Sequence, residues 1–422
     1  MKELEELGAR VDELWRAQNY DEEKFPSIAK DALKEASLPA RISAWDVLDW
    51  TVKNERLPGQ RDLHASFGDP PITVFTSPRF HVDVYFWFEG TTTRHQHGFC
   101  GAFQVLHGSS IHGWYEFEPR KKINAFAQVG DLRLKVCELL NVGDVQEIWS
   151  GPRYIHSLFH LDQPSATIVV RTVRSPLDLP QFNYLKPCLA IDPFFEEPSM
   201  IKKVQAAAAL FRAGRPESED VLADYLRNSD FQTCFYVLDS LRRFMGTAAE
   251  HVFAISASSD RLRRMLDVVA ETHPEYAEVL PDVFAYADRT AAIVTQRSVV
   301  TDPELRFFLA VLLNVEGRDR VYSLIKERFP GADPLEKVLD WVSELANTRV
   351  MGLNLPNALG VADFSDADVI LLENVLKGMS DEENAADFAS ELAGEDADAA
   401  RTRAAERIEV IRSANVFKPL LN

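Results

Sequence analysis

The residues of this chain that could do chemistry are concentrated at positions 94–108, which read RHQHGFCGAFQVLHG. The first two histidines of this segment, His95 and His97, are separated by one residue. Because side chains alternate between the two faces of an extended strand, both imidazoles are expected to point to one side and to reach one metal ion. A third imidazole, that of His156, follows farther along the chain. Three histidines that leave coordination positions open are typical of a catalytic transition-metal site rather than of a closed structural one.

The spacing of these residues resembles the two sequence motifs of the cupin superfamily. The first cupin motif runs from a His-x-His pair to a glycine, as the chain does here from His95 and His97 to Gly108. The second motif begins at a Gly-Asp pair, found here at 143–144, and ends at a single histidine, found here at His156. The resemblance implies that these three histidines are metal ligands. The alternative is a cupin-like barrel without a metal.

One departure from the cupin pattern concerns the set of ligands. The position at which cupins usually carry a glutamate ligand is occupied here by Gly101. Cupins of the thiol dioxygenase and diketone dioxygenase kind are similar in this respect, and they hold Fe(II). The resemblance, which covers residues 60–190, therefore implies an Fe(II) site with O₂ as co-substrate. Zinc and manganese are the alternative metals, because three histidines also suit zinc with a bound water.

Three imidazoles are neutral ligands, so the site would keep the full positive charge of the metal. An anionic substrate that ligates the metal directly is then favoured. With three protein ligands on one face, about three positions stay open for a bidentate substrate and O₂. Thiol dioxygenases also carry a Ser-x-His-x-Tyr relay, whereas residues 169–173 here contain neither His nor Tyr. The sequence therefore does not assign a thiol as the substrate.

Three polar residues near the histidines in sequence are candidates for catalytic roles. Arg171 interrupts an apolar strand, and if it faces the interior it can bind a substrate carboxylate. The alternative for Arg171 is a position on the outer surface. Tyr154 lies two residues before His156, so it is expected on the same face, with its hydroxyl near the metal. Gln104 is a polar residue in an otherwise apolar strand.

Composition limits the classes of partner. The net charge of −19 disfavours nucleic acids and anionic membranes, whose phosphates would be repelled. The four cysteines have no Cys-x-x-Cys spacing, and the acidic first residues do not resemble a secretory signal. No apolar stretch approaches the roughly 18 residues of a membrane span. We therefore expect a cytoplasmic protein with a small-molecule substrate. A homodimer is also expected, because cupins often pair their barrels.

The sequence divides into three predicted parts. Residues 1–58 have helical periodicity, with Ser43 and Asp46 spaced as a capping box. Residues 59–197 are rich in short β-branched and aromatic runs, which predict strands. Residues 198–422 are predominantly helical, and the nearly all-apolar run 305–313 predicts a buried central helix. The expected fold is an α+β multidomain protein, with a cupin-type double-stranded β-helix (jelly roll) between N-terminal helices and a large C-terminal all-α domain.

Two classes of function fit these features. The first is an Fe(II)-dependent cupin oxygenase that activates O₂ on a small anionic metabolite. The second is a metal- or ligand-binding regulatory module whose helical domain contacts a partner protein. A zinc or manganese hydrolase or isomerase is a third candidate. Substrate-dependent O₂ uptake distinguishes the first from the other two.

Overall fold

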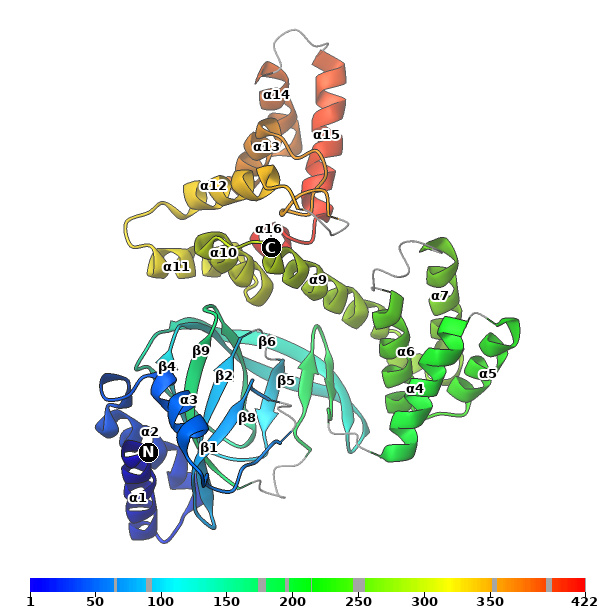
Figure 1. The fold of residues 1–422 in the computed structure, drawn as a ribbon. Helices are drawn as coiled ribbons and strands as arrows, with labels where there is room; N and C mark the ends of the chain where they lie inside the picture. The colour runs from blue at the N-terminus through cyan, green and yellow to red at the C-terminus, as the bar shows by residue number, and fades with distance from the viewer. Residues whose placement is uncertain are drawn as a thin grey trace.

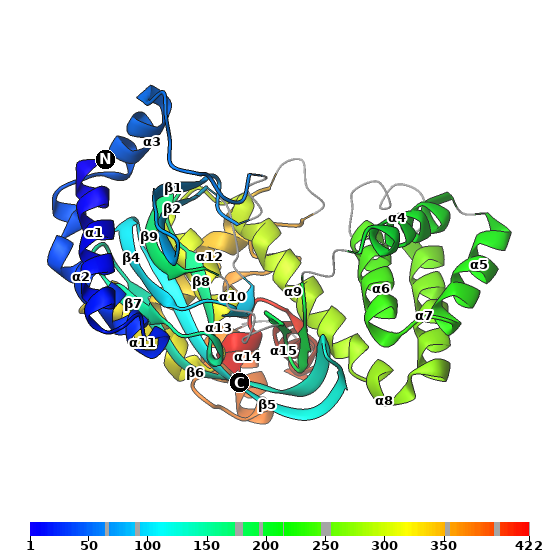
Figure 2. The same cartoon turned by 90° about the horizontal axis from the view of Figure 1, so that it is seen from below.

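The computed structural model describes residues 1–63, 67–88, 93–173, 180–193, 197–213, 215–245, 255–350, 355–391 and 397–421. A region of β-strands lies between N-terminal helices and a larger set of C-terminal helices (Figures 1 and 2). This combination of a β-rich region with many helices agrees with the predicted α+β class. The double-stranded β-helix and the boundaries at 58/59 and 197/198 stay predictions.

Three N-terminal helices precede the strands. They are α1 (Lys2–Ala17), α2 (Phe25–Ala36) and α3 (Ala44–Lys53). The predicted capping box of α3 is confirmed, since the Ser43 hydroxyl accepts the Asp46 N–H and the Asp46 carboxylate accepts the Ser43 N–H. These two hydrogen bonds satisfy donors that the first turn of a helix leaves unpaired.

The β region forms two sheets. Its strands are β1 (Pro71–Thr76), β2 (Phe80–Trp87), β3 (Arg94–His97), β4 (Gly101–His107), β5 (Ser110–Asn124), β6 (Ala127–Leu140), β7 (Val145–Ile148), β8 (Gly151–His160), β9 (Ser165–Thr172), β10 (Asn183–Leu185) and β11 (Leu189–Ile191). The first sheet has the order β1-β2-β9-β4-β7, and the second closes in the order β10-β11-β6-β5-β8-β3. Aromatic and aliphatic side chains from both sheets, including Trp87, Phe103 and Leu158, fill the space between them.

Helices cover the outer face of each sheet. Leu4 and Leu7 of α1 belong to one core with Val82 and Val84 of β2, which point away from the second sheet. The outer face of the second sheet packs on the C-terminal helices through β5 and β6, which contact α10 and α11. Helices therefore cover part of the outer face of each sheet, whereas several residues of β5 and β6, including Trp114 and Val136, are exposed.

The C-terminal helices form two groups. They are α4 (Pro198–Ala213), α5 (Pro216–Arg227), α6 (Phe231–Met245), α7 (Ile255–Thr272), α8 (Pro274–Ala277), α9 (Leu280–Ser298), α10 (Pro303–Asn314), α11 (Arg318–Arg328), α12 (Pro334–Asn347), α13 (Asp366–Leu376), α14 (Asp381–Glu391), α15 (Ala397–Ser413) and α16 (Lys418–Leu421). Helices α4 to α8 lie beside the far ends of β5 and β6, whereas α10 to α16 lie over the β region, and α9 connects the two groups (Figure 1).

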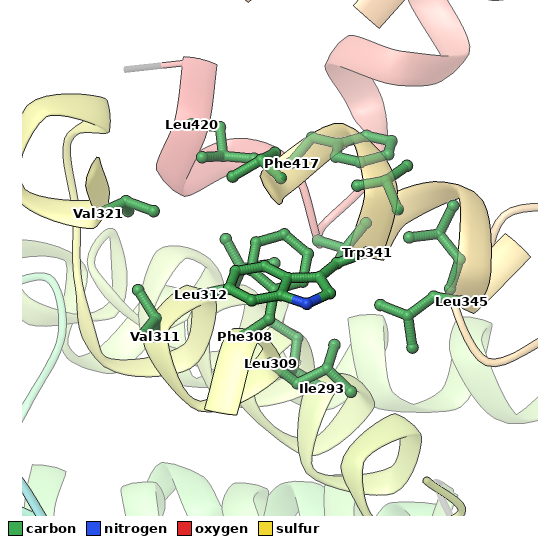
Figure 3. Close-up of a cluster of buried hydrophobic side chains, with 14 of the residues drawn as sticks. Ile293, Phe308, Leu309, Val311, Leu312, Val321, Trp341, Leu345, Phe417 and Leu420 are labelled. Atoms are coloured by element: carbon green, nitrogen blue, oxygen red, sulfur yellow. The ribbon is translucent and has the colours of Figure 1, made fainter. Parts of the chain in front are cut away.

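The predicted buried central helix is confirmed as α10. Phe308, Leu309 and Leu312 are fully buried among the surrounding helices (Figure 3). The ring of Phe308 lies 5.1 Å from that of Trp341 in α12. A helix that is apolar on all sides needs neighbours on all sides, and α10 has them in α9, α11, α12, α16 and β5. Among the described residues, no helix combines the length and apolar character needed to cross a membrane.

Candidate metal centre

The three histidines singled out from the sequence come together on two neighbouring strands. His95 of β3 is the Cα partner of His156 on β8, and the pairing register shifts between His95 and His97. All three side chains are buried. One ring nitrogen from each lies within 4.8 Å of the others. The alternation of side chains along β3 thus places both of its imidazoles beside that of β8.

The ring nitrogens are oriented as a ligand set requires. Nε2 of His97 and Nε2 of His156 face each other at 2.9 Å. Nδ1 of His95 lies 2.7 Å from the Thr93 carbonyl oxygen, to which it donates, so Nε2 carries the lone pair. This Nε2 atom is buried and has no hydrogen-bond partner. A buried acceptor without a partner is costly, and a metal ion at this point would satisfy all three nitrogens.

Burial also holds the three imidazoles in the neutral form that binds metals. It lowers the pKa of His95 and lowers that of His97 and His156 further, because the charged ring would lose its hydration. The neighbouring histidines add to this effect for His97 and His156. Within the described part of the chain, the cluster contains no carboxylate. The residues therefore fit a divalent metal whose charge the protein does not neutralise.

Gly101 explains why this site lacks the usual carboxylate ligand. A Cβ atom at this position would lie 2.0 Å from the Val170 carbonyl oxygen and 2.9 Å from the Cα atom of Arg171. Both of these atoms belong to the backbone of the paired strand β9, which cannot move aside as a flexible side chain could. A glutamate therefore has no space here.

We expect Gly101→Ala to lower the free energy of unfolding by about 3 kcal/mol, because the added methyl group must displace strand β9. Equilibrium denaturation in urea measures the change. Gly59→Ala is the matched control, since a Cβ atom there meets nothing within 4 Å. Equal stability of the two variants would contradict this explanation of Gly101.

A chain of contacts behind His156 was not found from the sequence. Nδ1 of His156 lies 3.4 Å from Nε2 of His112 on β5. Nδ1 of His112 in turn lies 2.9 Å from a carboxylate oxygen of Glu138, whose pKa this hydrogen bond lowers. If His112 donates to Glu138, its Nε2 atom is left to accept from His156. That arrangement directs Nε2 of His156 towards the other two histidines.

Tyr154 takes part in the same chain of contacts. Its hydroxyl lies 3.0 Å from Nε2 of His112, and its ring packs 4.7 Å from that of His156. Its expected position on the same strand face as His156 agrees with this packing. The hydroxyl, however, contacts His112 rather than the space between the three histidines. Tyr154 therefore helps to orient His112, which in turn contacts His156.

We expect His112→Phe to weaken metal binding by about 10- to 100-fold, the usual effect of losing an outer contact of a ligand. Glu138→Gln is expected to act in the same direction with a smaller effect. Competition with a fluorescent chelator measures both. Glu147→Gln is the control, because this carboxylate lies in the same surface groove but pairs with Lys30. If the metal affinity of His112→Phe is unchanged, His112 does not support metal binding by His156.

A cavity of 520 Å³ opens in front of the histidines. His95, His97 and Arg171 line it together with aromatic side chains. A smaller space of 50 Å³ shares His95, His97 and Arg171 with it, and His156 and mostly apolar residues such as Phe103 also line this space. Of the two alternatives for Arg171, the structure shows the interior one.

A polar network holds Arg171 in the cavity wall. Its guanidinium lies 3.6 Å from the centre of the Phe99 ring and donates to the Tyr85 hydroxyl at 3.4 Å. Tyr85 donates to Asp83 at 3.1 Å, and His81 contacts the same carboxylate oxygen. Burial alone would raise the pKa of Asp83, but the contact with His81 and the charge of Arg171 lower it overall. The carboxylate is therefore ionised, and its charge balances the guanidinium.

Gln104, the third candidate for a catalytic role, lies on the outer face of its strand. Its side-chain amide donates to the Gly143 carbonyl at 3.1 Å, and neither cavity at the histidines has Gln104 among its described lining residues. Gln104 is the Cα partner of Ile168, which packs under the N-terminal helices. Strand alternation therefore places Gln104 on the outer face of β4, while Phe103 points to the interior.

Comparisons with known proteins add little. No protein-family profile matches the chain, and no curated protein is significantly similar in sequence. Solved structures that match it include hydroquinone 1,2-dioxygenase from Sphingomonas sp. TTNP3 with 4-hydroxybenzoate bound (11% identity, TM-score 0.21, 29% of this chain and 87% of the other). Others are the DMSP lyases RdDddP and RnDddQII (15%, 0.23, 37% and 76%) and E. coli ycfD (12%, 0.21, 68% and 71%). TM-scores of 0.21–0.23 establish neither a common fold nor a common activity.

The geometry itself supports the cupin resemblance in a coarse form. A β region with a six-strand closed sheet carries a buried cluster of three histidines next to a cavity. The chain thus has a cupin-like β region with a site suited to a metal ion.

Proposed function

We propose that this protein is an Fe(II)-dependent oxygenase of the cupin type, which acts on a small anionic metabolite that ligates the metal directly. One observation carries the proposal. Three neutral imidazoles lie close together, and two of them, His95 and His97, line a 520 Å³ cavity whose lining also holds the guanidinium of Arg171. A positively charged metal site, together with the N–H donors of Arg171 in the same cavity, favours a ligand with a carboxylate or similar hydrogen-bond-accepting group.

His95, His97 and His156 would hold the metal. A bound Fe(II) ion would supply open coordination positions for a bidentate substrate and O₂. The chain positions two of the three rings by polar contacts, His95 through the Thr93 carbonyl and His156 through His112. Preorganised ligands reduce the cost of assembling the site when substrate binds.

Arg171 would bind and orient the substrate. Its planar group presents several N–H donors in a fixed fork, which matches a carboxylate. Its contacts with Phe99 and Tyr85 restrict its position, so a bound carboxylate would be held at a defined place relative to the histidines. This positions the rest of the substrate for reaction.

The small apolar space beside the histidines supports O₂ as the second reactant. Its 50 Å³ are lined by residues such as Trp87, Phe103 and Val169. An apolar diatomic molecule enters such a space more readily than water does, because water would lose hydrogen bonds there. The same walls exclude water from the reacting groups.

The test is O₂ consumption by the full chain after anaerobic loading with Fe(II). A panel of small carboxylates, hydroxy acids and diketones is added in turn, and an oxygen electrode records uptake. Uptake that requires both iron and one of these compounds supports the proposal. Turnover without O₂ in the zinc- or manganese-loaded protein would replace it with a hydrolase or isomerase. Metal binding with no turnover would favour a regulatory module.

A further inference from the structure

A second cavity, of 470 Å³, lies between β3, the β10–β11 pair and helices α6, α9 and α10. It adjoins the 520 Å³ cavity at the histidines, called the metal cavity below, because Thr93 and Asn183 line both. Arg94 lines the second cavity, whereas His95 and His97 line the first. Successive side chains of β3 thus face two different cavities.

The end of this cavity near β3 has an excess of buried positive charge. Arg94 donates to the hydroxyl of Tyr286 at 2.9 Å, and its guanidinium lies 5.2 Å from the centre of that ring. Lys186 and Arg289 lie 5.5 Å and 5.6 Å from the same ring. Three cations therefore surround one tyrosine.

One carboxylate compensates one of these three cations. Glu316 lies 2.7 Å from the Lys186 ammonium, whose side chain is only 4% exposed. Within the described residues, neither Arg94 nor Arg289 forms an ion pair, and Arg289 donates to the backbone carbonyls of Leu312 and Asn415. Two positive charges are left uncompensated, although the chain as a whole is strongly acidic. Buried charge of one sign is unfavourable unless an opposite charge comes close.

The rest of the cavity has balanced charges and apolar walls. At its other end Arg242 and Arg243 both pair with Asp239, and Arg242 also pairs with Asp288, so these charges balance. The walls between the two ends are apolar and aromatic, with Phe235 and Phe284 among them. Small-molecule sites commonly combine such walls with a few polar groups at one end.

We propose that this cavity is a second ligand site, which binds a small organic anion with an aromatic or branched aliphatic body. The anionic group would lie against Arg94, the uncompensated cation among the described lining residues, with Lys186 nearby. The body would contact Phe235 and Phe284. This site does not depend on the proposed oxygenase function, because none of the three histidines lines it.

The experiment is isothermal titration of the full chain with phenylacetate, benzoate and isovalerate, each beside its neutral amide. At least one carboxylate is expected to bind, and its amide at least about tenfold more weakly, because the amide lacks the charge-assisted contact. Arg94→Gln is expected to cause a similar loss. Ala287→Leu fills the cavity from α9 without changing any charge and is expected to abolish binding. Ala285→Leu, on the exposed side of the same helix, is the matched control.

Three results would overturn the proposal. The first is that none of the carboxylates binds. The second is that binding survives Ala287→Leu, which also covers the case in which Arg94→Gln fails to fold. The third is that binding is lost in His97→Ala, since the ligand would then lie in the metal cavity. None of these results depends on whether O₂ is consumed.

Discussion

The His156→Ala chain is expected to lose nearly all of the metal that the natural chain binds, about one ion per chain. Two imidazoles on β3 would be left, and the contact from His112 would have no ligand to orient. The loss of affinity is therefore expected to exceed the roughly 10- to 100-fold effect of an outer contact. Plasma mass spectrometry after anaerobic Fe(II) loading and desalting measures the metal content.

His273→Ala is the control for this measurement. His273 lies among the C-terminal helices, where its Nε2 atom contacts the Ser229 carbonyl at 2.8 Å. This variant is expected to keep its metal. If metal survives the loss of His156, the ligands lie elsewhere, and the oxygenase proposal fails with them.

Arg171→Gln is expected to raise the KM for the anionic substrate by about 10- to 100-fold while the iron content is unchanged. The reason is the loss of a charge-assisted contact inside a cavity where little water can replace it. Arg171→Lys keeps the charge but not the planar fork, so its KM is expected to lie between that of the natural chain and that of Arg171→Gln. Steady-state O₂ uptake at constant iron loading gives KM and kcat separately.

Arg133→Gln controls for the change in net charge. Arg133 is exposed and pairs with Glu118 on the β5–β6 hairpin, so its replacement is expected to leave KM unchanged. An Arg171→Gln enzyme with a normal KM would show that the guanidinium does not bind substrate. A variant that loses iron would show that Arg171 maintains the shape of the site instead.

The sequence was sufficient to find the histidine cluster because two of its members lie on one strand and the third follows at the spacing of a known motif. His95 and His97 need only one extended strand to share a face, and the cupin spacing pointed to His156. Arg171 could be located on a strand, but its face could not be assigned, because a single charge in an apolar run fits either side of a sheet covered on both faces. Only the register, in which Arg171 pairs with His81 and Gly101, decides its side.

Other features depend on contacts between distant parts of the chain. His112 and Glu138 support His156 across two further strands, and no local pattern connects them. Gln104 could not be assigned to a face either, because helices cover the outer face of its strand and both faces are therefore apolar around it. The described part of residues 198–422 is predominantly helical as predicted, but the bounds of α9 are not evident from periodicity, since its buried Arg289 and Arg297 donate to backbone carbonyls and interrupt the apolar pattern.

The helices on the outer faces of the two sheets determine which fragments of this protein can fold on their own. Residues 59–197 look like an independent unit, yet as a fragment they would expose Val82 and Val84 on one side and Ile111 and Phe159 on the other. Apolar patches of this kind promote aggregation. We expect the fragment to elute as large aggregates in size-exclusion chromatography, whereas the whole chain does not. The N-terminal and C-terminal helices are, in this sense, part of the folding unit that makes the metal cavity.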